Sequence, residues 1–489
     1  MNYHSDYYLD KEWKLTKLGL LIFPLLPTFG ILTLIFVIIS TFVQKWRSII
    51  GSSYNIALGC LGLWLAIASF LAQTPQEAWL GLANLLPFFL AFAAFSTLIQ
   101  TPSQLRQLSW IIVISSVPVI ILGFGQLFFG WSGLLNLQII LGWTLGSQGN
   151  PTGRMASVFM YANILAIYLT VVFILGLGLW IEKWKHLFGN REKSYQSTSL
   201  NEEKRSLPEL PLKETPPTPD RQTPSTEYNF PSRASFLRSN SLSNIFLTNS
   251  GQKFVFLTVV LIANMLALIL THSRNAWGLI VFASLAYAIY LGWHWLVALV
   301  MAALATIFGA AFAPLPLNKW LRVIVPEYFW ARLTDRNFER PVGILRSTQW
   351  QFAWDLTKKK PWSGWGLRNF TPLYEAQMQT WVGHPHNLFL MLTAETGIPA
   401  TLFLFGWVGW ILGKTVLLLI NWSSVNSRKD RLIVFSYLVA FGACTIFNMF
   451  DVSLFDLRVN TIGWLLLAGI FGVQKLKVNH PGLGTNQKL

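Results

Sequence analysis

Residues 254–313 read FVFLTVVLIANMLALILTHSRNAWGLIVFASLAYAIYLGWHWLVALVMAALATIFGAAFA, and Arg274 is the single formally charged residue among them. The stretch divides into three apolar runs, at 254–271, 276–292 and 293–313. About 20 consecutive apolar residues are enough for a helix to cross the hydrocarbon core of a bilayer. Only helices and closed barrels satisfy their backbone hydrogen bonds in lipid, and the runs lack the alternating pattern of barrel strands. The stretch therefore predicts three membrane-spanning helices.

The same pattern extends over the rest of the chain. Apolar residues make up 53% of the 489 residues and charged residues only 12%, about half the charged share of a soluble domain. This composition excludes a soluble enzyme, a disordered chain and a disulfide scaffold. We predict an all-α polytopic membrane protein with about 12 transmembrane helices and one large external loop. The further apolar runs lie at 18–43, 51–72, 79–99, 108–129, 156–180, 398–420, 432–450 and 461–473.

The first run leaves the number of helices open. If 18–43 is one helix, the chain has 11 spans and its N-terminus lies outside. A hairpin bent near Pro24, Pro27 and Gly30 gives twelve and places the N-terminus inside, although the run is short for two full spans. We prefer the hairpin.

Loop charges predict the orientation. Lys and Arg total 37 against 21 Asp and Glu, a formal net charge of +16. Because the basic residues flank apolar runs, we attribute them to cytoplasmic loops and expect no nucleic-acid partner. Arg428, Lys429 and Arg431 mark one such loop, and Lys475 places the C-terminus inside. The predicted parts are N-terminal helices (1–180), a Pro-rich disordered cytoplasmic linker (181–253), helices (254–313), a large external loop (314–397), C-terminal helices (398–474) and a cytoplasmic tail (475–489).

Several polar residues stand at the ends of runs that this topology places on the outer side. Arg154, Arg274, Arg346 and His386 are the candidates. Single Arg residues at helix ends commonly snorkel to the interface. The functional interpretation is that their planar guanidinium groups bind phosphate oxygens. Likewise, the Trp-rich stretch 350–365 suits either an interfacial belt or a sugar-binding platform.

His386 follows a proline that suits the first position of a helix. We therefore expect a helix over 386–397 with His386 in its first turn, where the helix dipole disfavours the charged imidazolium. A neutral imidazole can act as a general base. Glu395 would point away from His386 and pair with an Arg of another helix. His384 and His386 would diverge on a helix, so we expect no metal site, and Cys60 and Cys444 read as core residues.

Four stretches, in this order, carry a family resemblance: GRMASVFMYANILAIYL (153–169), LTHSRNAWGL (270–279), RSTQWQFAWDLTKKKPWSGWGLRNF (346–370) and HPHNLFLMLTAETGIPA (384–400). In them the sequence resembles the O-antigen ligase and polymerase superfamily, including its cyanobacterial branch linked to bicarbonate uptake. Two departures are the long linker and Asn275, which stands where a small Gly is usual.

The resemblance implies a membrane glycosyltransferase of the bacterial inner (plasma) membrane, with its active site facing the periplasm. It would move a glycan from an undecaprenyl-pyrophosphate carrier to an acceptor hydroxyl, with inversion and without a metal or other cofactor. Arg154 and Arg274 would hold the pyrophosphate, and His386 would be the general base. Arg346 and Glu395 would orient substrate or organise the loop. The partners would be a lipid-linked oligosaccharide donor, membrane lipid, and a glycan, lipid or protein acceptor.

Two other classes of function remain open. An inorganic-carbon (bicarbonate) transporter or transport accessory protein would need a polar path through the bilayer midplane, where the sequence places few charges. A structural or regulatory membrane protein would use the Pro-rich linker to bind partners. Only the transferase interpretation predicts that His386, Arg154 and Arg274 converge in one outer-facing cavity.

Overall fold

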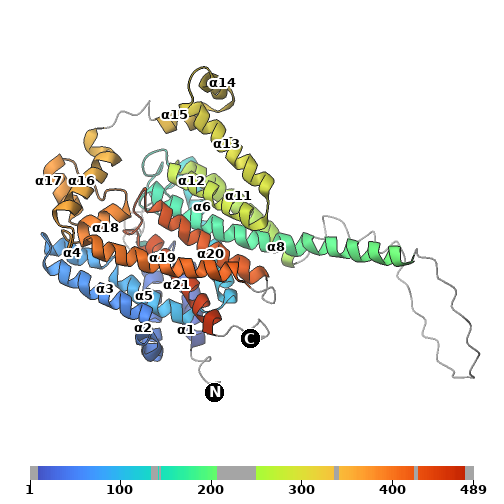
Figure 1. Ribbon diagram of the computed structural model, residues 1–489, viewed down its shortest axis with the longest axis horizontal. Helices are drawn as coiled ribbons and strands as arrows, with labels where there is room; N and C mark the ends of the chain where they lie inside the picture. The colour runs from blue at the N-terminus through green and yellow to red at the C-terminus, as the bar shows by residue number, and fades with distance from the viewer. Residues whose placement is uncertain are drawn as a thin grey trace, which may run out of the picture. The chain divides into compact units, whose positions relative to one another are not determined.

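Apolar helices dominate the residues that the structure describes, which are 9–133, 141–142, 145–205, 249–334, 341–422 and 428–479 of a computed structural model (Figure 1). Within these residues, eleven helical segments are long and apolar enough to cross a membrane. The predicted class of all-α polytopic membrane protein is confirmed. The segments are α2 (Pro27–Ile50), α3 (Ser53–Phe70), α4 with α5 (Pro75–Leu82 and Leu86–Leu98), α6 (Pro102–Phe128), the first part of α8 (Ala162–Arg205), α11 (Asn249–Leu270), α12 (Arg274–Leu291), α13 (His294–Phe312), α19 (Ile398–Ile420), α20 (Arg428–Phe447) and α21 (Leu457–Asn479).

The run 18–43 is divided between two antiparallel helices, α1 (Asp10–Ile22) and α2. Gly30 lies so close to the turn that an added Cβ would stand 2.7 Å from the Cα of Phe23. Farther along, Glu12 accepts hydrogen bonds from Ser40 and Gln44 of α2 at 2.7 and 2.6 Å. The predicted bend is therefore confirmed and the single helix is wrong, whereas the hairpin's count of twelve spans compares with eleven candidate spans among the described residues. With 13 residues, α1 is about 20 Å long, too short to cross a core of about 30 Å, and it is not among the eleven segments.

The predicted linker 181–253 needs correction at both ends. Helix α8 continues to Arg205 and α11 begins at Asn249, while residues 206–248 lie outside the described part of the chain. The described residues between 177 and 262 form a unit of their own. Within it, the Trp180 indole donates a hydrogen bond to Thr258 at 2.9 Å and stacks on Phe254 at 5.3 Å. These contacts tie α8 to α11.

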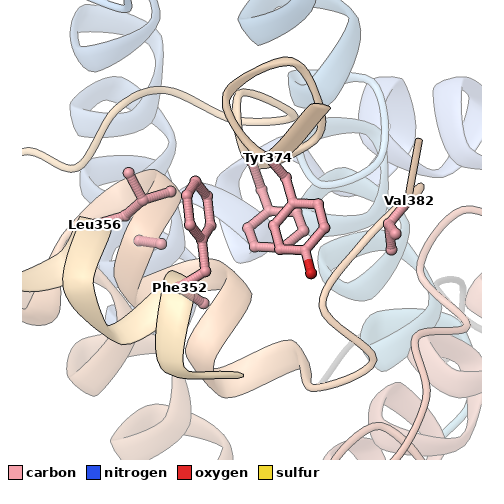
Figure 2. Packing of buried hydrophobic residues seen from close by; sticks show 7 residues of the cluster. Phe352, Leu356, Tyr374 and Val382 are labelled. Atoms are coloured by element: carbon pink, nitrogen blue, oxygen red, sulfur yellow. The ribbon is translucent and has the colours of Figure 1, made fainter. Parts of the chain in front are cut away.

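The segment predicted as the large external loop, 314–397, is mostly helical. Between α13 and α19 it contains α14 (Leu317–Ile324), α15 (Glu327–Thr334), the short 3-10 helix η3 (Val342–Ile344), α16 (Arg346–Lys359), α17 (Phe370–Met378) and α18 (Leu388–Thr396). Helices α16, α17 and α18 enclose a buried hydrophobic cluster. Figure 2 shows Phe352 and Leu356 extending from α16 toward Tyr374 of α17, and the rings of Phe352 and Tyr374 meet edge to face at 4.9 Å. This small core supports the residues around His386.

Candidate functional site

The sequence His384-Pro385-His386 forms a turn that precedes α18. Asn387 is the N-cap of that helix, and its side-chain oxygen accepts the backbone N–H of Leu390 at 2.9 Å. The prediction that Pro385 begins the helix and that His386 lies in its first turn is therefore wrong. Asn is among the best N-cap residues, and this cap fixes the start at Leu388. His386 instead adopts a left-handed backbone conformation (φ +53), which costs a non-glycine residue about 1–2 kcal/mol.

Asp451, in the connection between α20 and α21, faces both histidines. Its Oδ1 lies 2.9 Å from Nδ1 of His386 and 3.9 Å from Nε2 of His384. The Asp451 side chain is only 6% exposed, whereas that of His386 is 32% exposed. Burial acts to raise the pKa of Asp451, but the hydrogen bond with His386, the electrostatic interactions with His386 and His384, and the backbone N–H of Val452 bring that pKa below its ordinary value. Asp451 is therefore an ionised hydrogen-bond acceptor at neutral pH.

Arg154 is linked to the same carboxylate through one side chain. Its Nε donates to the carbonyl oxygen of Thr271 at 2.8 Å, and its Nη2 donates to Oδ1 of Asn163 at 2.6 Å. The amide nitrogen of Asn163 in turn donates to Oδ2 of Asp451 at 2.8 Å. A continuous hydrogen-bonded chain therefore runs from Arg154 through Asn163 and Asp451 to His386.

The loop that carries Arg154 is fixed by a buried glutamine of α6. The side-chain oxygen of Gln126 accepts the backbone N–H groups of Ala156 and Ser157 at 3.1 and 2.8 Å. The Ser157 hydroxyl donates to the carbonyl oxygen of Val119 at 2.6 Å. Because buried backbone groups must find partners, these bonds hold the loop against α6 and limit where Arg154 can stand.

Arg274 and Arg346 are each the first residue of a helix next to this chain. Arg274 is exposed and begins α12, whose second residue, Asn275, donates to the carbonyl oxygen of Phe450 at 3.5 Å. Arg346 begins α16, and Trp350 of that helix donates to the carbonyl oxygen of Pro385 at 2.9 Å. The starts of α12 and α16 thus lie beside the segments that carry Asp451 and His386.

The position of this hydrogen-bonded chain of side chains with respect to the membrane helices follows from these contacts. Asn163 lies in the first turn of α8 and Arg154 in the loop before it, Thr271 directly follows α11, and Asp451 lies between the end of α20 and the start of α21. Polar groups from several spans therefore gather at one common end of those spans, which corresponds to one face of the membrane. The sequence-based topology predicted that Arg154, Arg274 and His386 share one face.

Glu395 occupies a different place. It is buried in α18, where its Oε1 accepts the backbone N–H of Phe370 at 3.3 Å. Burial raises the pKa of Glu395 to about 8, against the opposing effect of backbone N–H groups of Arg368 and Phe370. Its expected partner was an Arg of another helix, but the Arg368 guanidinium pairs with Glu77 at 3.0 Å. Glu395 therefore contacts the turn before α17 and is not part of the hydrogen-bonded chain of side chains that ends at His386.

The two histidines and Asp451 also meet the distance criterion for a metal site, since one ligand atom from each lies within 4.8 Å of the others. The expectation that His384 and His386 diverge is wrong, because they lie in a turn and their rings are 4.5 Å apart. The hydrogen bonding does not suit a metal, however. Nδ1 of His384 accepts the backbone N–H of His386 at 3.2 Å, so the proton is on Nε2, the nitrogen that faces Asp451. A metal there would displace that proton or break the hydrogen bond.

An apolar cavity of about 140 Å³ adjoins the site. Leu388 lines it and donates its backbone N–H to the carbonyl oxygen of Asn448, which also lines it, at 2.8 Å. Arg154, Arg274 and His386 do not line this cavity. In this structure His386 and Arg154 are therefore connected through hydrogen bonds, and they do not line this cavity together.

Sequence reasoning missed Asn163, His384 and Asp451. Asn163 stands in the first of the four motif stretches, and Asp451 directly follows the apolar run 432–450, where an acid is costly unless it is paired. The energetic cost of an unpaired acid at this position was therefore the sequence signal that could have identified Asp451. The partner of Asp451 could not be read from the sequence, because 65 positions separate it from His386.

The fold and the site define a multi-pass, all-α membrane protein with a hydrogen-bonded polar cluster at one membrane face. Residues 257–405 match the family model described as O-antigen ligase, a range that includes Arg274, Arg346, His386 and Glu395. Over these residues the chain is similar to the O-antigen ligase family, and this match supports the predicted resemblance to the O-antigen ligase and polymerase superfamily. No curated protein matches the chain. The likeness to the bicarbonate-linked branch stays a prediction.

Proposed function

We propose that this protein is a glycosyltransferase that moves a glycan from an undecaprenyl-pyrophosphate carrier to an acceptor hydroxyl at the periplasmic face of the inner membrane. The observation that carries the proposal is the 2.9 Å contact between Nδ1 of His386 and Oδ1 of Asp451. The O-antigen ligase match over residues 257–405 supports the class of reaction.

The contact determines which nitrogen of His386 can act as a base. Because Asp451 is ionised, it accepts a proton-bearing Nδ1, which leaves the lone pair on Nε2. Among the described residues, Nε2 of His386 makes no hydrogen bond, and the side chain is partly exposed. A neutral imidazole oriented by a carboxylate is the arrangement that general-base catalysis requires.

In the proposed reaction, Nε2 of His386 removes the proton of the acceptor hydroxyl as its oxygen attacks the anomeric carbon. The bond between that carbon and the phosphate oxygen breaks, and the electron pair leaves with the pyrophosphate. Attack from the opposite side inverts the anomeric configuration. Asp451 stabilises the imidazolium that forms, and the next proton transfer to solvent restores His386.

Arg154 and Arg274 are the proposed ligands of the pyrophosphate, because guanidinium groups bind phosphate oxygens in a bidentate manner. Arg154 donates a hydrogen bond to the carbonyl oxygen of Thr271, which stands three residues before Arg274 in the sequence. This bond ties Arg154 to the segment that leads into Arg274. Developing negative charge on the leaving group would be stabilised there. Arg346, at the start of α16, would orient the substrate near His384. Glu395 would organise the loop through its contact with the turn before α17.

The test replaces His386 with Ala in cells that depend on this chain for a surface polysaccharide, with protein levels measured. His294→Ala is the matched control, because His294 begins α13 at the opposite end of α12 from Arg274, about 27 Å away for an 18-residue helix. We expect His386→Ala to abolish the long glycan ladder and to accumulate the lipid-linked precursor, while His294→Ala does neither. An unchanged ladder with normal expression of His386→Ala would overturn the proposal and favour transport or a structural role.

A further inference from the structure

The turn that presents His386 is held from both sides. Its backbone is in the left-handed region, and the next residue, Asn387, is extended (φ −151) as the N-cap of α18. Asn387 is itself fixed, because its side-chain nitrogen donates to the carbonyl oxygen of Met449 at 3.1 Å. On the other side, Trp350 donates to the carbonyl oxygen of Pro385. The chain must therefore change direction at His386, and a non-glycine residue needs support to do so.

His384 supplies that support through a side-chain contact. Its Nδ1 accepts the backbone N–H of His386, two residues later, at 3.2 Å. This is the pattern of an Asx turn, made here by an imidazole instead of a carboxamide. The His384 ring also stacks on Phe455 at 5.8 Å with an angle of 19°, which fixes its plane.

The environment of His384 keeps Nδ1 available as an acceptor. Burial, the neighbouring His386 and the charge of Arg346 lower the pKa of His384 to about 4, although Asp451 acts in the opposite direction. The ring is therefore neutral at pH 7. Its proton is on Nε2, on the side of Asp451, because Nδ1 is occupied by the backbone N–H.

We propose that His384 is a positioning residue: by accepting the N–H of His386, it holds the left-handed turn that brings Nδ1 of His386 to Asp451. The inference rests on the proposed function of His386 as a base. His384 itself touches neither donor nor acceptor in this role. The same turn explains why the two histidines lie close together, since both are arranged around one carboxylate.

The experiment compares His384→Ala with His384→Asn in the purified full chain. An Asn side chain can accept the N–H two residues later, so it preserves the turn while removing the imidazole. We expect His384→Ala to lower kcat by about 10²-fold with KM nearly unchanged, since a displacement of 1 Å near the reacting atoms has that effect. His384→Asn should recover most of the lost rate. Equal loss in both variants, or no loss in either, would overturn the inference.

A second measurement separates this inference from the proposed function. Histidine ¹⁵N NMR reports which ring nitrogen of His386 carries the proton, independently of any glycan. We expect the Nδ1–H form in the wild type and in His384→Asn, and its loss in His384→Ala. If His386→Ala transfers glycan normally, the function fails whatever the spectra show. If wild type loses activity with a chelator and both His384 variants are inactive, a metal role replaces the positioning role.

Discussion

The segment between α13 and α19 has two parts of similar aromatic content, a shorter first half (residues 314–334) and a longer second half (residues 342–396), and they differ in structure. In the first half, residues 314–334, Trp320, Val323 and Ile324 are 73%, 85% and 75% exposed, and α14 has no buried residue. In the second half, residues 342–396, Phe370 and Tyr374 are buried in the cluster of Figure 2. Aromatic content alone therefore does not produce a core; helices that cover one another do.

The cause of the difference is visible in the helices themselves. Leu317, Trp320 and Ile324 share one face of α14, but none of the three is buried. On α16, Phe352 and Leu356 also share a face, and α17 and α18 cover it. The second half also carries the turn with His386, so the proposed active site is built on the half that has its own core.

The largest expected effect comes from the cluster. Phe370→Ala removes a ring that stacks on Tyr374 at 5.3 Å and meets Phe352 edge to face at 5.8 Å. We expect the free energy of unfolding to fall by about 3–5 kcal/mol, as for other buried Phe residues. Thermal unfolding in detergent micelles measures it. Trp362→Ala is the matched control, since Trp362 lies in the same half but is 75% exposed. Equal losses in the two variants would show that the cluster is not the stabilising core.

The next largest effect is expected where the backbone at Gly364 lies close to the backbone of α18 in the second half. Gly364 has φ +67, and an added Cβ would stand 2.4 Å from the carbonyl carbon of Glu395. We expect Gly364→Ala to destabilise the protein by about 1–3 kcal/mol, through strain and overpacking. Gly413→Ala is the control, because that helical glycine has open space around its Cα. A Gly364→Ala variant as stable as the wild type would contradict the close approach.

The third prediction concerns pH. Because the folded pKa of Glu395 is about 8 against an ordinary value of 4.5, the folded state holds a proton that the unfolded state has lost between these values. Its contribution to stability is therefore complete below about pH 4.5 and declines as the pH rises through 8, by about 1.4 kcal/mol per pH unit at most. Glu395→Gln cannot titrate.

The measurement is the thermal midpoint of the wild type and of Glu395→Gln at pH 6 and at pH 8. The wild type should lose more stability than the variant over this interval, and the difference isolates Glu395 from the histidines. If both proteins lose the same amount, Glu395 is not a buried neutral acid.

The smallest effect is expected in the first half. Trp320→Ala should change the free energy of unfolding by less than about 0.5 kcal/mol, because an exposed side chain loses few contacts. The same thermal assay as for Phe370→Ala gives a direct comparison of the two halves. A loss as large as that of Phe370→Ala would mean that the two halves are packed alike, and the contrast would fail.

The sequence predicted best what apolar composition alone decides. The run 293–313 became α13 (His294–Phe312), and the run 398–420 became α19 (Ile398–Ile420), because a span is determined by the hydropathy of consecutive residues. The start of α18 was missed although its signal was local: Asn387 is a better N-cap than Pro385 is a first residue. The contact between Asp451 and His386 depends on how α20 packs against the rest, which hydropathy does not specify.

The hydrogen-bonded chain from Arg154 to His386 also has a consequence for how the protein is made. Asn163 and Asp451 are separated by 288 positions, so at about 5–20 residues per second the ribosome reaches Asp451 roughly 15–60 s after Asn163. Until then, His386 has no carboxylate partner. If His386 is the base that we propose, a nascent chain that lacks Asp451 is expected to be inactive even after most of its helices have been inserted.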